Sequence, residues 1–268
     1  MSDAIRAFEH AGWQQAAETY AGAFATATRQ FIPDILAAAD VTRGQAILDV
    51  ACGLGFLTQA ADDAGARATG LDFSGAMLSV AVRLHPTLRF DRGDAEALPY
   101  EDQSFDAVVS SFGIHHAPNP INALKEAHRI LRPGGHLAFA TWTEPANNIA
   151  WKLVFDAVRA YGDPTASKAP PPGGGLTSQT ACLDALTRAN FQQGRVVRIG
   201  KTWHHKDGAA LLEALKSGTA RMAALIGAQT EDALTRIAQA IDEAATPYRD
   251  ATGLAIPIAA YLVTGRRS

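Results

Sequence analysis

The stretch Ala46-Ile-Leu-Asp-Val-Ala-Cys-Gly-Leu-Gly-Phe56 decides the fold. Its first half, residues 46–51, is a short apolar run of the kind that forms a buried strand. Gly53 and Gly55 then allow the backbone to turn sharply and to approach a ligand closely. A helix predicted from about Phe56 to Ala64 directs its free N–H groups at the same point. The stretch therefore predicts a strand–turn–helix unit with a ligand at the turn.

Short apolar runs alternate with amphipathic stretches after this unit. Further strands are expected at residues 67–72, 88–94, 104–112, 136–142, 194–203 and 255–266. Further helices are expected over residues 74–84, 119–131, 147–161, 178–189 and 207–246, and residues 4–40 are expected to be helical, with a new helix starting at Pro33. Alternation of strands and helices with short loops predicts an α/β fold: a seven-stranded, mostly parallel sheet with helices on both faces.

The chain divides into a core and two inserted segments. Residues 1–44 are expected to form an N-terminal helical segment, and residues 45–142 the ligand-binding core, which residues 178–203 and 254–268 complete. The insertions 143–177 and 204–253 interrupt the rhythm of strands and helices, and both are expected to leave the sheet at the edge that carries the glycine turn. They therefore predict a helical cap over the site. The Pro- and Gly-rich stretch 167–178 is expected to be an irregular flap or linker.

Two carboxylates follow the next two strands. Asp72 ends the second strand, 19 residues after Gly53, and can accept hydrogen bonds from both hydroxyls of a ribose. Asp94 follows the third strand and can accept from the amino group of an adenine, with the Ala95 amide nearby. Each residue taken alone could instead cap a helix or form a turn. Together with Gly53 they lie at the carboxyl ends of three successive strands, where open α/β sheets bind ligands.

The glycine pattern argues against a dinucleotide cofactor. Dinucleotide-binding turns carry a third glycine that permits close packing of helix and strand. Here Thr58 takes that place, and the extra small residue, Ala51, lies upstream. An NAD(P)-dependent oxidoreductase is therefore disfavoured.

The chain resembles the class I S-adenosylmethionine (SAM)-dependent methyltransferases, in particular the branch that includes the ubiquinone and menaquinone methyltransferases. The resemblance covers about residues 45–142 through ILDVACGLGFLT, ATGLDFSGAML, GDAEALPYEDQSFDAVVSSFGIHHAPNP and ALKEAHRILRPGGHLAFATW. One departure is Ala51, where the family has a glycine. The resemblance implies a Rossmann-like fold, SAM as the cofactor and S-adenosylhomocysteine (SAH) as the product.

The resemblance also implies roles for individual residues. Asp49, Ala51, Cys52, Gly53 and Gly55 belong to the glycine-turn motif, and Ala51, Cys52 and Gly53 are expected to line the methionine end of SAM. Asp72 is expected to bind the ribose, Phe73 and Met77 the adenosine, Asp94 and Ala95 the adenine, and Ser111 is expected to face the cofactor. Tyr20, placed in an N-terminal helix, matches an aromatic position that closes over the SAM carboxylate in several relatives.

Two histidines are candidates for a catalytic base. Methyl transfer from a sulfonium is an in-line displacement, so the enzyme mainly aligns the acceptor and excludes water. An acceptor that must lose a proton needs a base, and histidine is the usual one. His115 and His116 follow the fourth strand, where acceptor and cofactor should meet, although either could merely shape the pocket. His204 and His205 are weaker candidates, and Trp142 and Trp151 could line the acceptor pocket or pack in the core.

The bulk composition excludes several classes of function. The net charge is −3, which argues against a nucleic-acid partner, and the pairs Arg129/Arg132 and Arg266/Arg267 are interpreted as solvated surface. The chain has two cysteines, Cys52 and Cys182, so no disulfide framework is expected. Neither a signal peptide, nor a membrane span, nor a metal site is expected, and the protein is predicted to be cytoplasmic. The oligomeric state is left open, with a homodimer as one option.

Several functions remain open on sequence grounds. The preferred one is methyl transfer to a small, hydrophobic or aromatic acceptor, because the segments 143–177 and 204–253 contribute Trp, Phe and Leu to the expected cap. The alternatives are a SAM-binding enzyme of the same fold that does not methylate, such as a decarboxylase or cyclase, and a SAM-binding protein without catalysis. Neither the acceptor nor the atom that would be methylated can be deduced from these patterns.

Overall fold

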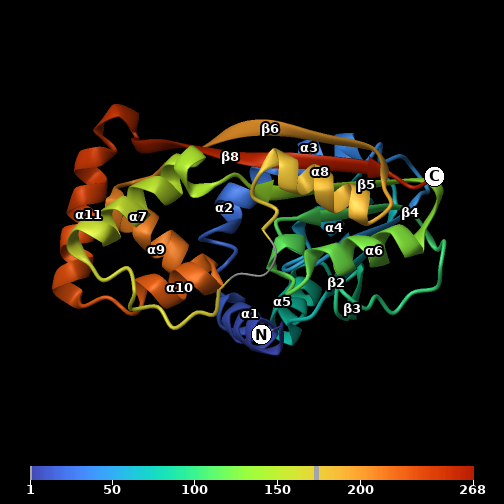
Figure 1. Ribbon diagram of the computed structural model, residues 1–268, viewed down its shortest axis with the longest axis horizontal. Helices are drawn as coiled ribbons and strands as arrows, with labels where there is room; N and C mark the ends of the chain where they lie inside the picture. The colour runs from blue at the N-terminus through green and yellow to red at the C-terminus, as the bar shows by residue number, and fades with distance from the viewer. Residues whose placement is uncertain (1, 172–174) are drawn as a thin grey trace.

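A single mixed sheet forms the centre of the molecule (Figure 1), in the order β3-β2-β1-β4-β5-β8-β6. The computed structural model describes residues 2–171 and 175–268. The strands are β1 (Ala46–Val50), β2 (Arg67–Asp72), β3 (Arg89–Arg92), β4 (Phe105–Ser111), β5 (Leu131–Trp142), β6 (Gln192–His205) and β8 (Gly253–Arg266). Strands β1 to β5 pair in parallel, and β8 lies antiparallel between β5 and β6. The α/β fold with its seven main strands is thus confirmed, and a short β7 (Arg249–Asp250) pairs with β8 as an addition.

Helices cover both faces of this sheet because its central strands are apolar on both sides. Ile47 and Val109 pack on one face with helices α3 (Ile32–Ala38) and α4 (Phe56–Asp63). Leu48 and Val108 point to the other face and pack with α6 (Pro120–Ile130) and α8 (Gln179–Arg188). Successive residues of a strand point to opposite faces, so a strand buried on both faces is a continuous apolar run. Helix α5 (Gly75–Leu84) packs near β3 and against α1 (Ser2–Ala16).

The N-terminal segment is broken into more pieces than expected. The prediction of a continuous helix up to Pro33 was wrong. Helix α1 ends at Ala16, and α2 (Ala25–Thr28) and a 3-10 turn follow before α3. Gly22 weakens the helix locally. The Thr19 hydroxyl donates to the Ser217 carbonyl (2.7 Å). This contact with a residue far along the chain holds the turn between α1 and α2. Tyr20 therefore lies in this turn and not in a helix.

The segment 207–246 is likewise three helices and not one. They are α9 (Gly208–Gly218), α10 (Ala220–Ile226) and α11 (Glu231–Ala244). Thr219 and Thr230 cap the second and third of these, accepting from the amides of Met222 and Ala233 at 3.2 Å. Such caps favour a new start over continuation of the helix.

Strand β5 starts five residues earlier than expected, at Leu131 and not at His136. Leu131 pairs with Phe105 and His136 with Ala107, so the residues between them form an irregularity in the ladder. The arginine, proline and two glycines there were expected to end a helix and to lie outside the strand. They are instead accommodated as a bulge within it.

Helices α9, α10 and α11 gather at one end of the molecule with α7 (Ile149–Tyr161) (Figure 1). Their buried side chains continue the core from the α3 face of the sheet. Arg221 of α10 donates to the Pro170 carbonyl (2.7 Å) and so holds part of the Pro/Gly stretch in place. Part of the expected flap, residues 172–174, lies outside the described residues. The cap and the domain boundaries remain predictions.

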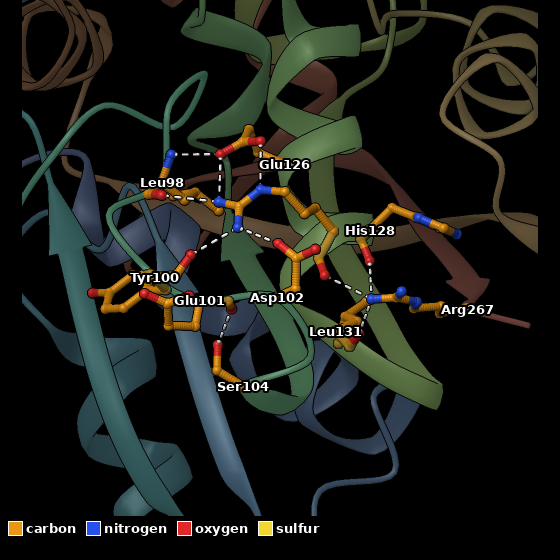
Figure 2. Close-up of polar contacts among 10 residues, drawn as sticks. Leu98, Tyr100, Glu101, Asp102, Ser104, Glu126, His128, Leu131 and Arg267 are labelled. Atoms are coloured by element: carbon orange, nitrogen blue, oxygen red, sulfur yellow. Dashed lines mark hydrogen bonds and ion pairs between the residues drawn. The ribbon is translucent and has the colours of Figure 1, made fainter.

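Two arginines interpreted as solvated surface instead join distant segments (Figure 2). Arg129 of α6 donates to the carbonyls of Leu98 (2.9 Å) and Tyr100 (2.7 Å) and thereby holds the loop before β4. Arg267 donates to the carbonyls of His128 (3.0 Å) and Arg129 (2.6 Å) at the end of the same helix. A guanidinium has five donors in a fixed fork and can hold several carbonyls at once. These arginines therefore stabilise the fold, and their place in the sequence gives no sign of it.

Among residues 2–171 and 175–268, no helix is both long enough and apolar enough to cross a membrane. The same described ranges contain no group of three His, Cys, Asp or Glu side chains arranged to hold a metal ion.

Candidate functional site

A cavity of about 1000 Å³, partly open to solvent, lies at the carboxyl ends of β1, β2 and β4. Most of the residues proposed from sequence line it: Tyr20, Ala51, Cys52, Gly53, Asp72, Phe73, Met77, Asp94, Ala95, Ser111 and His116. Asp49, Gly55 and His115 do not line it. The N-terminal segment supplies lining residues that the sequence did not single out: Arg6, Glu9, Trp13, Thr28, Arg29 and Ile32.

Asp72 is the anchor of the glycine turn. Its carboxylate accepts from the amide of Gly53 (2.8 Å) and from the amide of Ser74 (2.8 Å), and the residue is only 5% exposed. Burial raises the pKa of Asp72, and the two amides act against that rise. The helix cap is Ser74, whose hydroxyl accepts from the amide of Met77. Each carboxylate oxygen keeps a further lone pair, so Asp72 can also accept from a ligand in the cavity.

Asp49 holds the turn from behind. It is 1% exposed and accepts from the Thr58 hydroxyl at 2.7 Å, which ties β1 to the first turn of α4. Burial raises the pKa of Asp49 to about 7, and the nearby charge of Asp72 adds to the rise. Its role in this structure is to shape the loop. Thr58, which stands where a dinucleotide-binding turn has its third glycine, is the hydrogen-bond partner of Asp49.

Ala51 occupies a backbone conformation that favours glycine. Its φ is 56°, in the left-handed region, where a side chain costs about 1–2 kcal/mol. A Cβ on Gly113 would meet the Ala51 Cβ at 2.4 Å, so the loop after β4 must keep a glycine opposite. Cys52 lies beside this alanine, and burial raises its thiol pKa well above the usual value. The thiol is therefore protonated and unsuited to act as a nucleophile.

Replacing Ala51 by glycine should raise the free energy of unfolding by about 0.5–1 kcal/mol, because the relief of strain exceeds the added entropy of the unfolded chain. Urea denaturation measures this. Ala61→Gly within helix α4 is the control, and it should destabilise the protein. Destabilisation by Ala51→Gly would show that the left-handed backbone is not strained.

Helix α1 closes the end of the cavity that Asp94 lines. Arg6 pairs with Asp94 and, at 3.3 Å, with Glu96. Asp94 also accepts from the amide of Glu96 (2.9 Å) and so stabilises the turn after β3. The same residue lines the cavity. Since its side chain is 38% exposed, Asp94 can still meet a ligand there.

The end of the cavity that Arg29 and Tyr20 line carries a cation and a phenol. Arg29 lies with its guanidinium carbon 4.3 Å from the centre of the Phe56 ring. It forms no salt bridge within the described ranges 2–171 and 175–268. The Tyr20 hydroxyl lies 3.0 Å from the Thr28 hydroxyl, and burial raises the Tyr20 pKa to about 12. This end can therefore receive an anionic group such as a carboxylate.

The two adjacent histidines differ in environment. His116 lines the cavity, with its Nδ1 3.1 Å from a carboxylate oxygen of Glu9. The Nδ1 of His115 is buried without a hydrogen-bond partner in the described part of the chain. Burial, followed by the nearby charges of His116 and Arg221, lowers the His115 pKa well below its usual value. Of the pair, only His116 is placed to meet a ligand.

The aromatic side chains expected near an acceptor form a packed cluster. Trp142 stacks on Phe112 with ring centroids 3.9 Å apart and lies 4.6 Å from Trp151. Neither tryptophan lines the cavity, whereas Phe112 does. His205 is also packed, against Trp203, and burial lowers its pKa to about 4.

Comparison with known proteins covers the central part of the chain. Residues 48–139 match the family model described as a methyltransferase domain. The demethylmenaquinone methyltransferase of Renibacterium salmoninarum is 42% identical over 118 residues, which are 44% of this chain and 50% of that protein. The phthiotriol/phenolphthiotriol dimycocerosates methyltransferase of Mycobacterium leprae is 41% identical over 119 residues, 42% of this chain and 43% of that protein. The chain thus spans about half the length of the curated relatives it matches.

Solved structures extend the likeness of fold over most of the chain. A SAM-dependent methyltransferase of Thermotoga maritima has a TM-score of 0.57 at 15% identity, covering 96% of this chain and 99% of that one. The [4+2]-cyclase SpnF has a TM-score of 0.54 at 20% identity, covering 89% and 81%. A Haemonchus contortus phosphoethanolamine N-methyltransferase, solved with SAH, has a TM-score of 0.54 at 19% identity, covering 89% and 52%. At these identities the likeness shows the fold alone.

Proposed function

We propose that this chain, whose residues 48–139 match the family model of a methyltransferase domain, transfers a methyl group from SAM to a small-molecule acceptor. The observation that carries the proposal is Asp72, a buried carboxylate that ties the glycine turn to α5 and faces the cavity. The cavity has largely apolar walls with a few polar side chains, as small-molecule sites do.

The residues along the cavity fit the parts of SAM in order. Asp94 and Ala95 would hold the adenine, Asp72 the ribose, and the turn from Ala51 to Gly53 the methionine chain, with Arg29 at its carboxylate. SAM supplies an activated methyl group on a sulfonium. What the protein then provides is alignment of the acceptor and exclusion of water, for which α1 and the turn around Tyr20 form the outer wall.

The acceptor is proposed to be hydrophobic or aromatic. Trp13, Ile32 and Phe112 give the cavity apolar walls. One relative of the chain is a demethylmenaquinone methyltransferase. The alternative is a SAM-binding enzyme of the same fold that does not methylate. A [4+2]-cyclase is among the solved structures of similar fold. Incubation with SAM labelled in the methyl group separates the two: label transferred to an acceptor supports methylation, whereas a reaction without consumption of SAM supports the alternative.

Arg29→Met should weaken SAH binding about tenfold, because a charge-assisted hydrogen bond to the carboxylate is lost at an exposed site. Calorimetry with SAH measures the change. Adenosine, which lacks the carboxylate, is the matched ligand and should bind the variant and the wild type equally. If the affinities for both ligands fell together, Arg29 would be acting on the shape of the cavity and not on the carboxylate.

A further inference from the structure

Glu9 is a buried charge with partners from three parts of the chain. It belongs to α1, is 1% exposed and lines the cavity. One carboxylate oxygen accepts from Trp13 Nε1 (3.1 Å) and lies 3.1 Å from His116 Nδ1. The other lies 2.8 Å from the Nε of Arg221 in α10. Burying a carboxylate is expensive even when it is paired, so its place in a cavity wall points to a use beyond packing.

The surroundings of Glu9 keep it ionised. Burial by itself would raise the pKa of Glu9, but His116, Arg221 and Trp13 outweigh burial and hold the pKa below its usual value. An ionised carboxylate can only accept hydrogen bonds. At 3.1 Å from this carboxylate, His116 Nδ1 is favoured as the protonated ring nitrogen.

A proton on Nδ1 fixes the chemistry of the other ring nitrogen. In a neutral imidazole with its proton on Nδ1, Nε2 is a lone-pair acceptor. His116 Nε2 has no hydrogen-bond partner among the described residues, and the ring lines the cavity. The Trp13 ring packs edge-on to this imidazole at 5.0 Å and limits its rotation.

We propose that Glu9 is a positioning residue that holds His116 with Nε2 facing the acceptor, so that His116 acts as general base toward an acceptor hydroxyl. The inference rests on the proposed methyl transfer and names its acceptor class. The hydroxyl proton passes to Nε2 while the oxygen forms a bond to the methyl carbon. The bond from methyl carbon to sulfur breaks with its electron pair left on sulfur, which gives SAH. Glu9 then stabilises the imidazolium, which later releases its proton to water.

The titratable and charged groups around His116 come from three parts of the chain. Glu9 lies on α1 and Arg221 on α10, while the neutral His115 precedes it in the chain, with ring centroids 4.1 Å apart. Arg221 belongs to the segment 204–253, so this segment reaches the site through Glu9 without lining the cavity itself. The arrangement explains how a distant helix can influence the base.

The tautomer of His116 tests the positioning directly. Long-range ¹H–¹⁵N spectra of the full chain labelled in histidine should show His116 protonated on Nδ1 in the wild type. Glu9→Leu keeps the approximate size and removes the acceptor, so the proton should move mainly to Nε2. Glu18→Gln, at an exposed carboxylate paired with Arg83, is the control and should keep the wild-type tautomer. An Nε2-protonated His116 in the wild type, which is measured without any variant, would overturn the proposal, as would an unchanged tautomer in Glu9→Leu.

The reactivity of Nε2 tests its role toward the acceptor. Diethyl pyrocarbonate should modify His116 at least about five times more slowly in Glu9→Leu than in the wild type, with the exposed His204 as internal reference. Saturating SAH should leave the His116 rate unchanged, because the base faces the acceptor and not the cofactor. Protection of His116 by SAH would instead make it a cofactor contact. If calorimetry shows no SAH binding, the proposed function fails whatever the His116 tautomer is, so the two failures are distinguishable.

Discussion

Asp72→Ala should weaken SAH binding by at least 100-fold. The substitution removes the acceptor of the Gly53 and Ser74 amides, both at 2.8 Å, together with the proposed partner of the ribose hydroxyls. Each ribose hydroxyl that is buried without its acceptor costs about 1–3 kcal/mol of binding free energy, and the two hydroxyls together account for the expected loss. Calorimetric titration of SAH measures the effect, with NAD as the comparison ligand.

Two further variants separate the role of Asp72 from a general loss of structure. Asp72→Asn retains the size and one acceptor oxygen, so its affinity should fall between the wild type and Asp72→Ala. Asp62→Ala, at an exposed carboxylate of α4, should bind SAH as the wild type does. Should Asp72→Ala keep its affinity, or the wild type prefer NAD, the glycine turn serves a different ligand and the proposed function is wrong.

Trp203→Ala should lower the free energy of unfolding by about 3–5 kcal/mol, the usual range for a fully buried aromatic residue. Trp203 of β6 is 1% exposed, and its ring packs edge-on against Phe24 at 5.5 Å. Its Nε1 donates to the Thr26 hydroxyl at 2.7 Å. Equilibrium unfolding in urea measures the loss.

The same tryptophan should also affect binding. It fastens the segment that carries Tyr20 and Thr28 onto the sheet, and both of these residues line the cavity. SAH affinity should therefore fall in Trp203→Ala although Trp203 itself does not line the cavity. Trp203→Phe keeps one aromatic ring but loses the indole hydrogen bond and part of the ring volume, so it should destabilise less than Trp203→Ala does. A loss under 1 kcal/mol for Trp203→Ala would show that the segment is held by other contacts.

The parts of the fold that follow from local patterns could be predicted from sequence. Every main strand was located, because a strand buried on both faces is an uninterrupted apolar run whatever packs on it. Most residues predicted to bind the cofactor line one cavity for a related reason: they immediately follow strands, and parallel strands bring their carboxyl ends to one edge. Asp72 and Asp94 are 22 residues apart in sequence and still line one cavity.

The errors occurred where distant contacts decide the local structure. The break after α1 depends on Thr19 and Ser217, which are 198 residues apart. The bulge at the start of β5 depends on its pairing with β4. Propensity within a short window contains no information on such partners.

The sequence by itself determined the α/β sheet, the glycine turn and the carboxylates that follow the strands, because each of these depends on neighbours along the chain. Only the tertiary structure decided which of two adjacent histidines faces the cavity. It also showed that Arg6, Glu9 and Arg29 of the N-terminal segment complete the wall. Glu9 lies 107 residues before His116 and 212 before Arg221 in sequence, and a buried charge acquires its role only from the groups that the fold brings to it.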